Sequence, residues 1–91
     1  MGVKVRLSAS LATFVQGRRE IPVSGETVEA AMADFAKQHE ALSERLFYED
    51  GGLREFINLY LNETDIRDLN GLATKVGDND VIAIIPAVAG G

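Results

Sequence analysis

The residues of this sequence most suited to chemistry are the last two, Gly90 and Gly91. Glycine has no Cβ, so a Gly-Gly end is narrow and its backbone can adopt nearly any φ and ψ. Residues 81–91 carry no charged side chain, which leaves the α-carboxylate of Gly91 as the ionised group of this stretch. Such an end can enter a narrow channel and present its carboxylate to an activating group. We therefore expect Gly91, with Gly90 beside it, to be the reactive site.

Other kinds of chemistry find less support. The chain has no cysteine, which excludes a disulfide, a thiolate nucleophile and a cysteine-based metal site. His39 is the single histidine and has no second ligand at hand, so a packing or capping role at a helix end is favoured. The polar runs 62–65 and 78–80 lack the spacing of a calcium loop and are interpreted as turns. We predict no metal site and no bound cofactor.

The element that must position the diglycine is the apolar run 81–85, which precedes it. β-Branched residues dominate this run, as in a buried strand, and the turn-forming residues 78–80 come before it. Pro86 cannot donate to a sheet ladder and marks the end of the strand. Residues 87–91 then form a free tail that reaches about 17 Å at full extension. We predict a domain at 1–86 and a flexible tail at 87–91.

The remaining elements follow from periodicity. Val3, Val5 and Leu7 alternate with polar residues in a first strand, and a second strand over 20–23 contains Pro22, which suggests a sheet edge. Thr27 is a plausible N-cap for a long helix. The apolar stripe of this helix is Val28, Ala31, Met32, Phe35 and His39.

The second half of the chain continues the pattern. Residues 56–61 form a third strand, and 66–67 are expected to add a short strand after the turn at 62–65. Leu69 and Leu72 are expected to fill the core. The order ββαβ(β)β predicts an α+β fold of the β-grasp, or ubiquitin-like, type. Its mixed sheet has four to five strands, one main helix on one face, and adjacent, parallel first and last strands.

The last strand is apolar on both faces. Ile82 and Ile84 are expected to face the helix, and the residues between them to face away. The predicted partner-binding residues are therefore Phe56, Tyr60, Val81, Ala83 and Ile85, followed by Pro86, Ala87, Val88 and Ala89. The alternative is that these are ordinary sheet residues or are covered by loops. Lys4, Arg6, Arg18 and Arg19 are clustered in the sequence and are candidates to flank this patch, but we interpret them as solvated strand charges.

Length and composition set the class of protein. Ninety-one residues make one domain, and 46% apolar with 25% charged residues is typical of a soluble globular protein. The net charge of −5 argues against nucleic acid and anionic membranes as partners. No apolar run is long enough to span a membrane and no signal peptide is evident, so a cytoplasmic location is expected.

Three segments together resemble one family. They are residues 78–91 (Asp-Asn-Asp-Val-Ile-Ala-Ile-Ile-Pro-Ala-Val-Ala-Gly-Gly), 56–67 (Phe-Ile-Asn-Leu-Tyr-Leu-Asn-Glu-Thr-Asp-Ile-Arg) and 71–74 (Gly-Leu-Ala-Thr). The chain resembles the ubiquitin-like sulfur carriers, which include the small subunit of molybdopterin synthase and the thiamine-pathway carrier. It looks most like the carrier of a thiocarboxylate route to cysteine.

The resemblance implies a mechanism and partners. An E1-like enzyme would use ATP to adenylate the Gly91 carboxylate, sulfide or a persulfide would displace AMP to leave a thiocarboxylate, and a downstream synthase would accept the sulfur. The chain would then be a protein co-substrate and not an enzyme. A metalloprotease would be needed only if a precursor extends beyond Gly91. Three alternatives stay open: a molybdopterin synthase small subunit, a ubiquitin-like modifier joined to lysines, and a plain interaction module.

Overall fold

The computed structural model describes residues 2–47, 54 and 57–86 of the chain. The predicted tail at 87–91 and Phe56 lie outside the described residues. The elements are β1 (Val3–Leu7), α1 (Ala9–Ala12), η1 (Thr13–Val15), β2 (Glu20–Val23), α2 (Val28–Gln38), α3 (Glu40–Leu46), β3 (Ile57–Leu61), β4 (Thr64–Asp65), η2 (Ile66–Asp68), η3 (Gly71–Ala73) and β5 (Val81–Pro86), where η marks a 3₁₀ helix.

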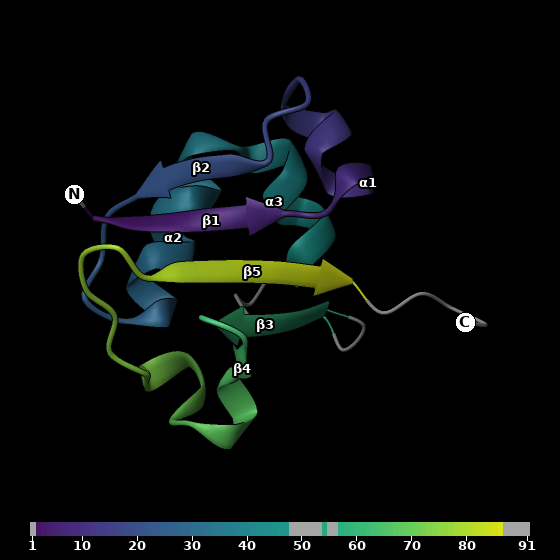
Figure 1. The fold of residues 1–91 in the computed structure, drawn as a ribbon. Helices are drawn as coiled ribbons and strands as arrows, with labels where there is room; N and C mark the ends of the chain where they lie inside the picture. Colours follow the sequence, from purple (N-terminus) through teal and green to yellow (C-terminus); the bar gives the residue numbers. More distant parts are fainter. Residues whose placement is uncertain (1, 48–53, 55–56, 87–91) are drawn as a thin grey trace.

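The strands form one mixed sheet of five in the order β2-β1-β5-β3-β4. β5 lies at its centre, parallel to β1 and antiparallel to β3, and the outer pairs are antiparallel (Figure 1). The first and last strands are therefore adjacent and parallel, as the sequence predicts. β5 ends at Pro86, which is the last described residue, so the chain continues from the central strand of the sheet.

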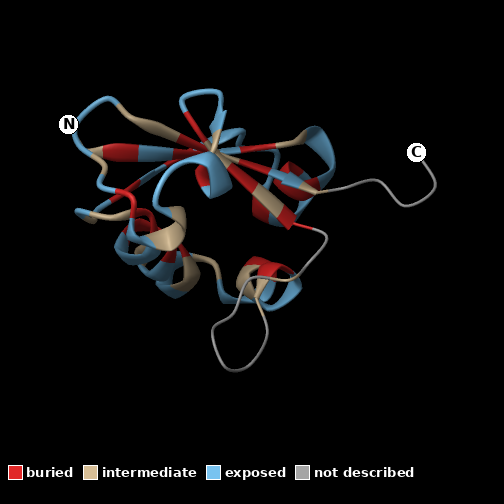
Figure 2. Ribbon diagram, turned by 90° about the horizontal axis from the view of Figure 1, so that it is seen from below, coloured by how far each residue is buried: buried red, intermediate tan, exposed pale blue. Residues whose placement is uncertain are grey.

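The helices α2 and α3 cover one face of the sheet and leave the other open (Figures 1 and 2). Buried and less buried residues alternate along β1, β3 and β5, and the buried set faces the helices. On β5, Ile82 and Ile84 are buried, which confirms their predicted direction. In the part of the chain that the structure describes, no helix has the length and apolar character that a membrane span requires.

The main helix begins where the sequence predicts. The Thr27 side chain accepts a hydrogen bond from the Ala30 amide at 3.1 Å and so caps the amino end of α2. The predicted stripe from Val28 to Phe35 is buried. The helix ends at His39, whose amide donates to the Phe35 carbonyl and whose ring centroid lies 5.5 Å from that of Phe35. The predicted packing of His39 at the helix end is confirmed, and its backbone amide makes the capping hydrogen bond.

Gly25 lies where the chain passes closest to the first turn of α2. A Cβ at this position would lie 2.5 Å from the Ala31 backbone nitrogen and 2.8 Å from the Ala30 carbonyl carbon. Backbone atoms cannot move aside as a side chain can, so the Gly25→Ala variant should lose about 3 kcal/mol of unfolding free energy. Chemical denaturation measures the loss.

The matched control for that variant is Gly77→Ala. A Cβ at Gly77 would meet no atom within 4 Å, and the backbone there needs no positive φ. Unchanged or slightly raised stability is expected, because alanine restricts the unfolded chain more than glycine does. Equal stability of the two variants would contradict the close approach at Gly25.

The edge strand β2 is closed to further pairing, and Pro22 lies on it as predicted. Pro22 has no N–H to offer, and its carbonyl accepts a hydrogen bond from the Gln38 side-chain amide at 3.2 Å. The Asp34 carboxylate accepts from the Ser24 amide at 2.9 Å and from Gln38 at 3.0 Å. Side chains of α2 thus satisfy the polar groups that another strand would need.

The fourth strand differs from the prediction. Residues 66–67 belong to η2, and the strand is β4 at Thr64–Asp65, two residues earlier. The reason is the turn: Asn62 and Glu63 both have positive φ, 48° and 79°, so two residues reverse the chain and Leu61 faces Thr64. Such turns usually need glycine at the second position, and here Glu63 takes it.

The prediction that Leu69 is a core residue is wrong. Its side chain is 43% exposed, whereas Ile66, three residues earlier in η2, is 5% exposed and belongs to the core cluster. The turn at 62–63 starts η2 early enough that Ile66 reaches the core and Leu69 faces solvent. Leu72 packs partly buried against the core.

Candidate functional site

The candidate site is the face of the sheet opposite the helices, beside β5. Side chains alternate across a strand, so Val81, Ala83 and Ile85 lie on this outer face while their neighbours enter the core. Tyr60 of β3 pairs in register with Ala83 and therefore shares the face. Ile85 is 45% exposed, a large fraction for an isoleucine on a central strand. The structure brings these four predicted residues together.

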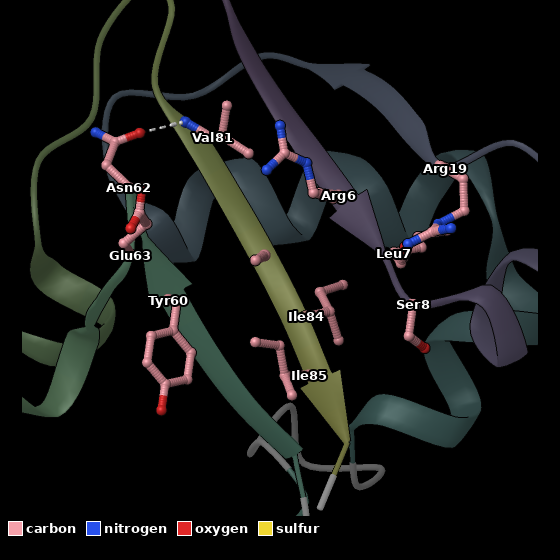
Figure 3. Close-up of a pocket in the computed structure, with 11 residues that line it drawn as sticks. Arg6, Leu7, Ser8, Arg19, Tyr60, Asn62, Glu63, Val81, Ile84 and Ile85 are labelled. Carbon is pink, nitrogen blue, oxygen red and sulfur yellow. Dashed lines mark hydrogen bonds between the residues drawn. The ribbon is translucent and has the colours of Figure 1, made fainter.

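The outer face holds a shallow groove of about 640 Å³ along β5, which we call the outer groove (Figure 3). Its apolar lining consists of Tyr60, Val81, Ala83 and Ile85 together with Leu7 and Ile84. Polar side chains stand at its margins, from β1 and the chain after it on one side and from the turn after β3 on the other. They are Arg6, Ser8, Arg19, Asn62 and Glu63. An apolar strip with a polar rim is the usual anatomy of a protein-binding surface.

The positive charges of the arginine side chains at the margin of the outer groove are partly neutralised. The Arg6 guanidinium lies 3.0 Å from the Glu20 carboxylate, and the Lys4 ammonium lies 3.9 Å from it. Arg19 Nε donates a hydrogen bond to the Leu7 carbonyl at 2.6 Å, which holds this side chain at the groove. Lys4 and Arg6 are thus ion-paired strand charges at the surface, while Arg6 and Arg19 also line the groove.

The start of β5 is fixed by the turn after β3. Asn62 Oδ1 accepts a hydrogen bond from the Val81 amide at 3.0 Å (Figure 3), and Asn62 Nδ2 donates to Asp80 Oδ1 at 2.9 Å. Asp80 Oδ2 accepts from the Gly77 amide at 2.8 Å. The predicted turn around Asp80 is therefore held by its own carboxylate. Within residues 2–47, 54 and 57–86, no group of three acidic, histidine or cysteine side chains could hold a metal ion.

The structure describes some of the predicted site residues and leaves others undescribed. Phe56, Ala87, Val88, Ala89, Gly90 and Gly91 lie outside the described residues. Pro86 ends β5 but borders a second groove, formed with Ile57 and Phe14, and not the outer groove. Sequence analysis missed Ser8, Asn62 and Glu63; only the tolerance of asparagine for positive φ gave a signal for Asn62. That these surfaces bind partners stays a prediction.

The strand β4 carries an ion pair behind the Tyr60 side of the site. Asp65 pairs in register with Tyr60, and its carboxylate lies 2.6 Å from the Arg67 guanidinium. Hydrogen bonds from the Arg67 side chain and then from the Arg67 amide lower the pKa of Asp65, and the same side-chain hydrogen bond raises the pKa of Arg67. The ionised carboxylate is therefore the form that the fold favours.

This pair predicts a pH-dependent contribution to stability. The depressed pKa of Asp65 means that the contribution is complete above the ordinary value of 3.8 and is lost as pH falls through the folded-state pKa. The Asp65→Asn variant keeps an acceptor for the Arg67 amide but loses the charge. We expect a small decrease in its melting temperature at pH 7 that disappears in acid. A decrease of equal size at all pH values would contradict an electrostatic origin.

Comparisons with known proteins agree with this architecture. The model of the ThiS family matches residues 5–91. The sulfur carrier protein CysO of Mycobacterium tuberculosis (strain H37Rv) is 38% identical over 93 residues, covering 100% of both proteins.

Two solved structures are also similar. One is a chain in the crystal structure of the Amycolatopsis orientalis BexX/CysO complex, with a TM-score of 0.86, 37% identity, and coverage of 99% of this chain and 100% of that one. The other is the small archaeal modifier protein 1 (SAMP1) of Methanosarcina acetivorans, with a TM-score of 0.87, 36% identity, and coverage of 98% and 95%. With its β-grasp fold confirmed, the chain belongs to the ThiS family, as its resemblance to ubiquitin-like sulfur carriers predicts.

Proposed function

We propose that the protein is a sulfur carrier that acts through the carboxylate of Gly91. The observation that carries the proposal is the full-length similarity to CysO, named a sulfur carrier protein, at 38% identity. The fold supports it, because β5 is held between β1 and β3 and five residues follow it in the sequence. These residues can extend about 17 Å from a rigid base.

The proposed chemistry proceeds in two steps at one carbon atom. A carboxylate oxygen of Gly91 attacks the α-phosphorus of ATP and releases pyrophosphate, which gives an acyl-adenylate. The sulfur of hydrosulfide then attacks the carbonyl carbon, the bond to the AMP oxygen breaks, and a thiocarboxylate, AMP and a proton result. A persulfide donor would first form an acyl disulfide with release of AMP, and a thiol would then reduce its S–S bond, which frees the thiocarboxylate and leaves the donor in a disulfide with that thiol. Glycine suits both steps because no side chain crowds the carbonyl.

The chain itself supplies the acyl group and a docking surface, and its partners supply the catalysis. We propose that the outer groove receives an E1-like adenylating enzyme, which binds ATP, and that a downstream synthase then accepts the sulfur. The likeness to CysO favours a route to cysteine, with a cofactor or another sulfur-containing metabolite as the other destinations. ATP is abundant in the cytoplasm, where we place the reaction. The protein is accordingly a co-substrate and not an enzyme.

The test is the intact mass of the protein isolated from its native cells, before and after treatment with a thiol-alkylating reagent. The chain has no cysteine, so a thiocarboxylate is the group in it expected to react like a thiol. A species with one sulfur in place of one oxygen, which takes up one alkyl group, supports the carrier. An unmodified mass under sulfur-limited and sulfur-replete growth alike would contradict it.

A second candidate function is protein modification. SAMP1, which is 36% identical to this chain, is named a modifier protein. In this case a target lysine amine would attack the same acyl group, and an isopeptide bond to Gly91 would form. The same cells distinguish the two functions, since tryptic peptides of other proteins that carry a Gly91-derived remnant would favour the modifier.

A further inference from the structure

The second groove lies next to the point where β5 ends. It has a volume of about 350 Å³ and is lined by Leu11, Phe14, Arg45, Arg54, Ile57 and Pro86, with the nearby helix residues Ser10, Glu44 and Leu46. Consecutive residues of β5 belong to different grooves: Ile85 lines the outer groove and Pro86 lines the second. An enzyme that surrounds the chain beyond Pro86 would therefore lie next to both grooves.

An aromatic ring and an arginine form the exposed part of this groove. The Arg45 guanidinium carbon lies 4.5 Å from the centroid of the Phe14 ring, and Phe14 is 44% exposed. This contact connects η1 to the last turn of α3 and holds the guanidinium over the ring. An arginine held in this way loses little side-chain entropy when it binds a ligand.

The charge of Arg45 is not neutralised within the described part of the chain. The ion pairs there join Lys4 and Arg6 to Glu20 and Arg67 to Asp65, and none of them includes Arg45. A second guanidinium, that of Arg54, lies in the same groove and donates to the Glu44 carbonyl at 3.0 and 3.2 Å. Arg45 and Arg54 are the cations that line the groove and Glu44 is its anion, so Arg45 makes the groove a local basic site with an apolar floor on a chain with a net charge of −5.

We propose that the second groove receives a carboxylate side chain, with an apolar neighbour, from the adenylating enzyme that takes the Gly91 tail. The inference rests on the proposed function. A planar guanidinium binds a carboxylate through two parallel hydrogen bonds, and Arg45 is an exposed residue that a partner can reach. Phe14, Leu11 and Pro86 offer the apolar contact. The enzyme thus holds the base of the tail from two sides.

A role in stabilising α3 would also explain why an arginine is found at position 45. A cation in the last turn favours the negative end of α3, so Arg45 would stabilise the helix in any case. That role needs neither the exposed ring nor the position beside Pro86. Stability and binding therefore have to be measured on the same variants.

The experiment measures the affinity of the full chain for its purified adenylating enzyme by calorimetry at low and high salt. For Arg45→Glu we expect the dissociation constant to rise about tenfold or more at low salt, because two carboxylates then meet. Arg45→Lys keeps the charge but loses the two-pronged hydrogen bonding, and an intermediate loss is expected. Lys37→Glu, on an exposed position of α2, makes the same charge change away from the groove and should bind like the parent chain.

The outcomes separate the two proposals. Equal affinity of Arg45→Glu and Lys37→Glu, with the parent chain binding normally, would overturn the inference about the groove alone. Failure of the parent chain to bind the enzyme would overturn the proposed function and the inference together. Circular dichroism of each variant shows whether a loss of affinity comes from a loss of fold, and a parallel Phe14→Ala variant should weaken binding with Arg45 still present.

Discussion

Removal of Gly90 and Gly91 is expected to abolish thiocarboxylate formation completely while the domain stays folded. The described core cluster lies between Val3 and Ile84, so the deletion removes none of its residues. The shortened chain ends at Ala89, whose Cβ crowds the carbonyl and whose carboxylate stands two residues, or about 7 Å, short of the reacting position. The reaction should fall below detection, because the carboxylate of the shortened chain cannot reach the position where it would react.

The measurement uses the adenylating enzyme, ATP and sulfide, with the product followed by intact mass and the fold by thermal melting. Ala87→Ser is the matched control, since it changes the tail but keeps its length and both glycines. It should react nearly as well as the parent chain. Full conversion of the shortened chain would contradict the need for the diglycine, and full activity of the shortened protein in its native cells would leave only a plain interaction module among the functions considered.

The Ile85→Glu variant is expected to lose about a hundredfold in affinity for the adenylating enzyme with little change in stability. Ile85 is 45% exposed on the outer face, so a glutamate there stays hydrated in the free protein. A docked partner would have to desolvate that carboxylate, which costs roughly 3 kcal/mol. On the strand itself the change is worth at most about 1 kcal/mol.

Two further variants serve as controls for this prediction. Leu69→Glu is the control for binding, because Leu69 is 43% exposed and does not line the outer groove. Ile84→Glu is the control for orientation, because Ile84 is 1% exposed and a buried charge there should unfold the domain. Unfolding of Ile85→Glu would place Ile85 in the core, and parent-like affinity would remove the outer groove from the docking surface.

Most of the correct predictions came from the alternation of buried and exposed positions along the strands. In β5 it separated Ile82 and Ile84 from Val81, Ala83 and Ile85, and that single distinction locates both the core and the outer groove. Thr27 and the spacing of apolar residues placed the start of α2 in the same way. These are local signals, because each depends on residues a few positions apart.

The features that sequence could not predict depend on contacts between distant segments. Nothing in a run of polar residues shows that Glu63 adopts a φ of 79°, yet this turn moves β4 and exposes Leu69. The stacking of Arg45 on Phe14 joins residues 31 positions apart, and it exists only because η1 packs beside α3. The second groove was missed for the same reason.

The central place of β5 has a mechanical consequence. Under the proposed function, an enzyme that draws the tail into a channel would pull on Pro86 along the direction of the strand. Hydrogen bonds of a sheet run across its strands, so such a pull loads the bonds to β1 and β3 in shear and all together. An edge strand would have one such row to resist the pull, and could be peeled away bond by bond if pulled sideways. Under the proposed function, the domain would therefore stay folded each time a partner enzyme binds and releases the tail.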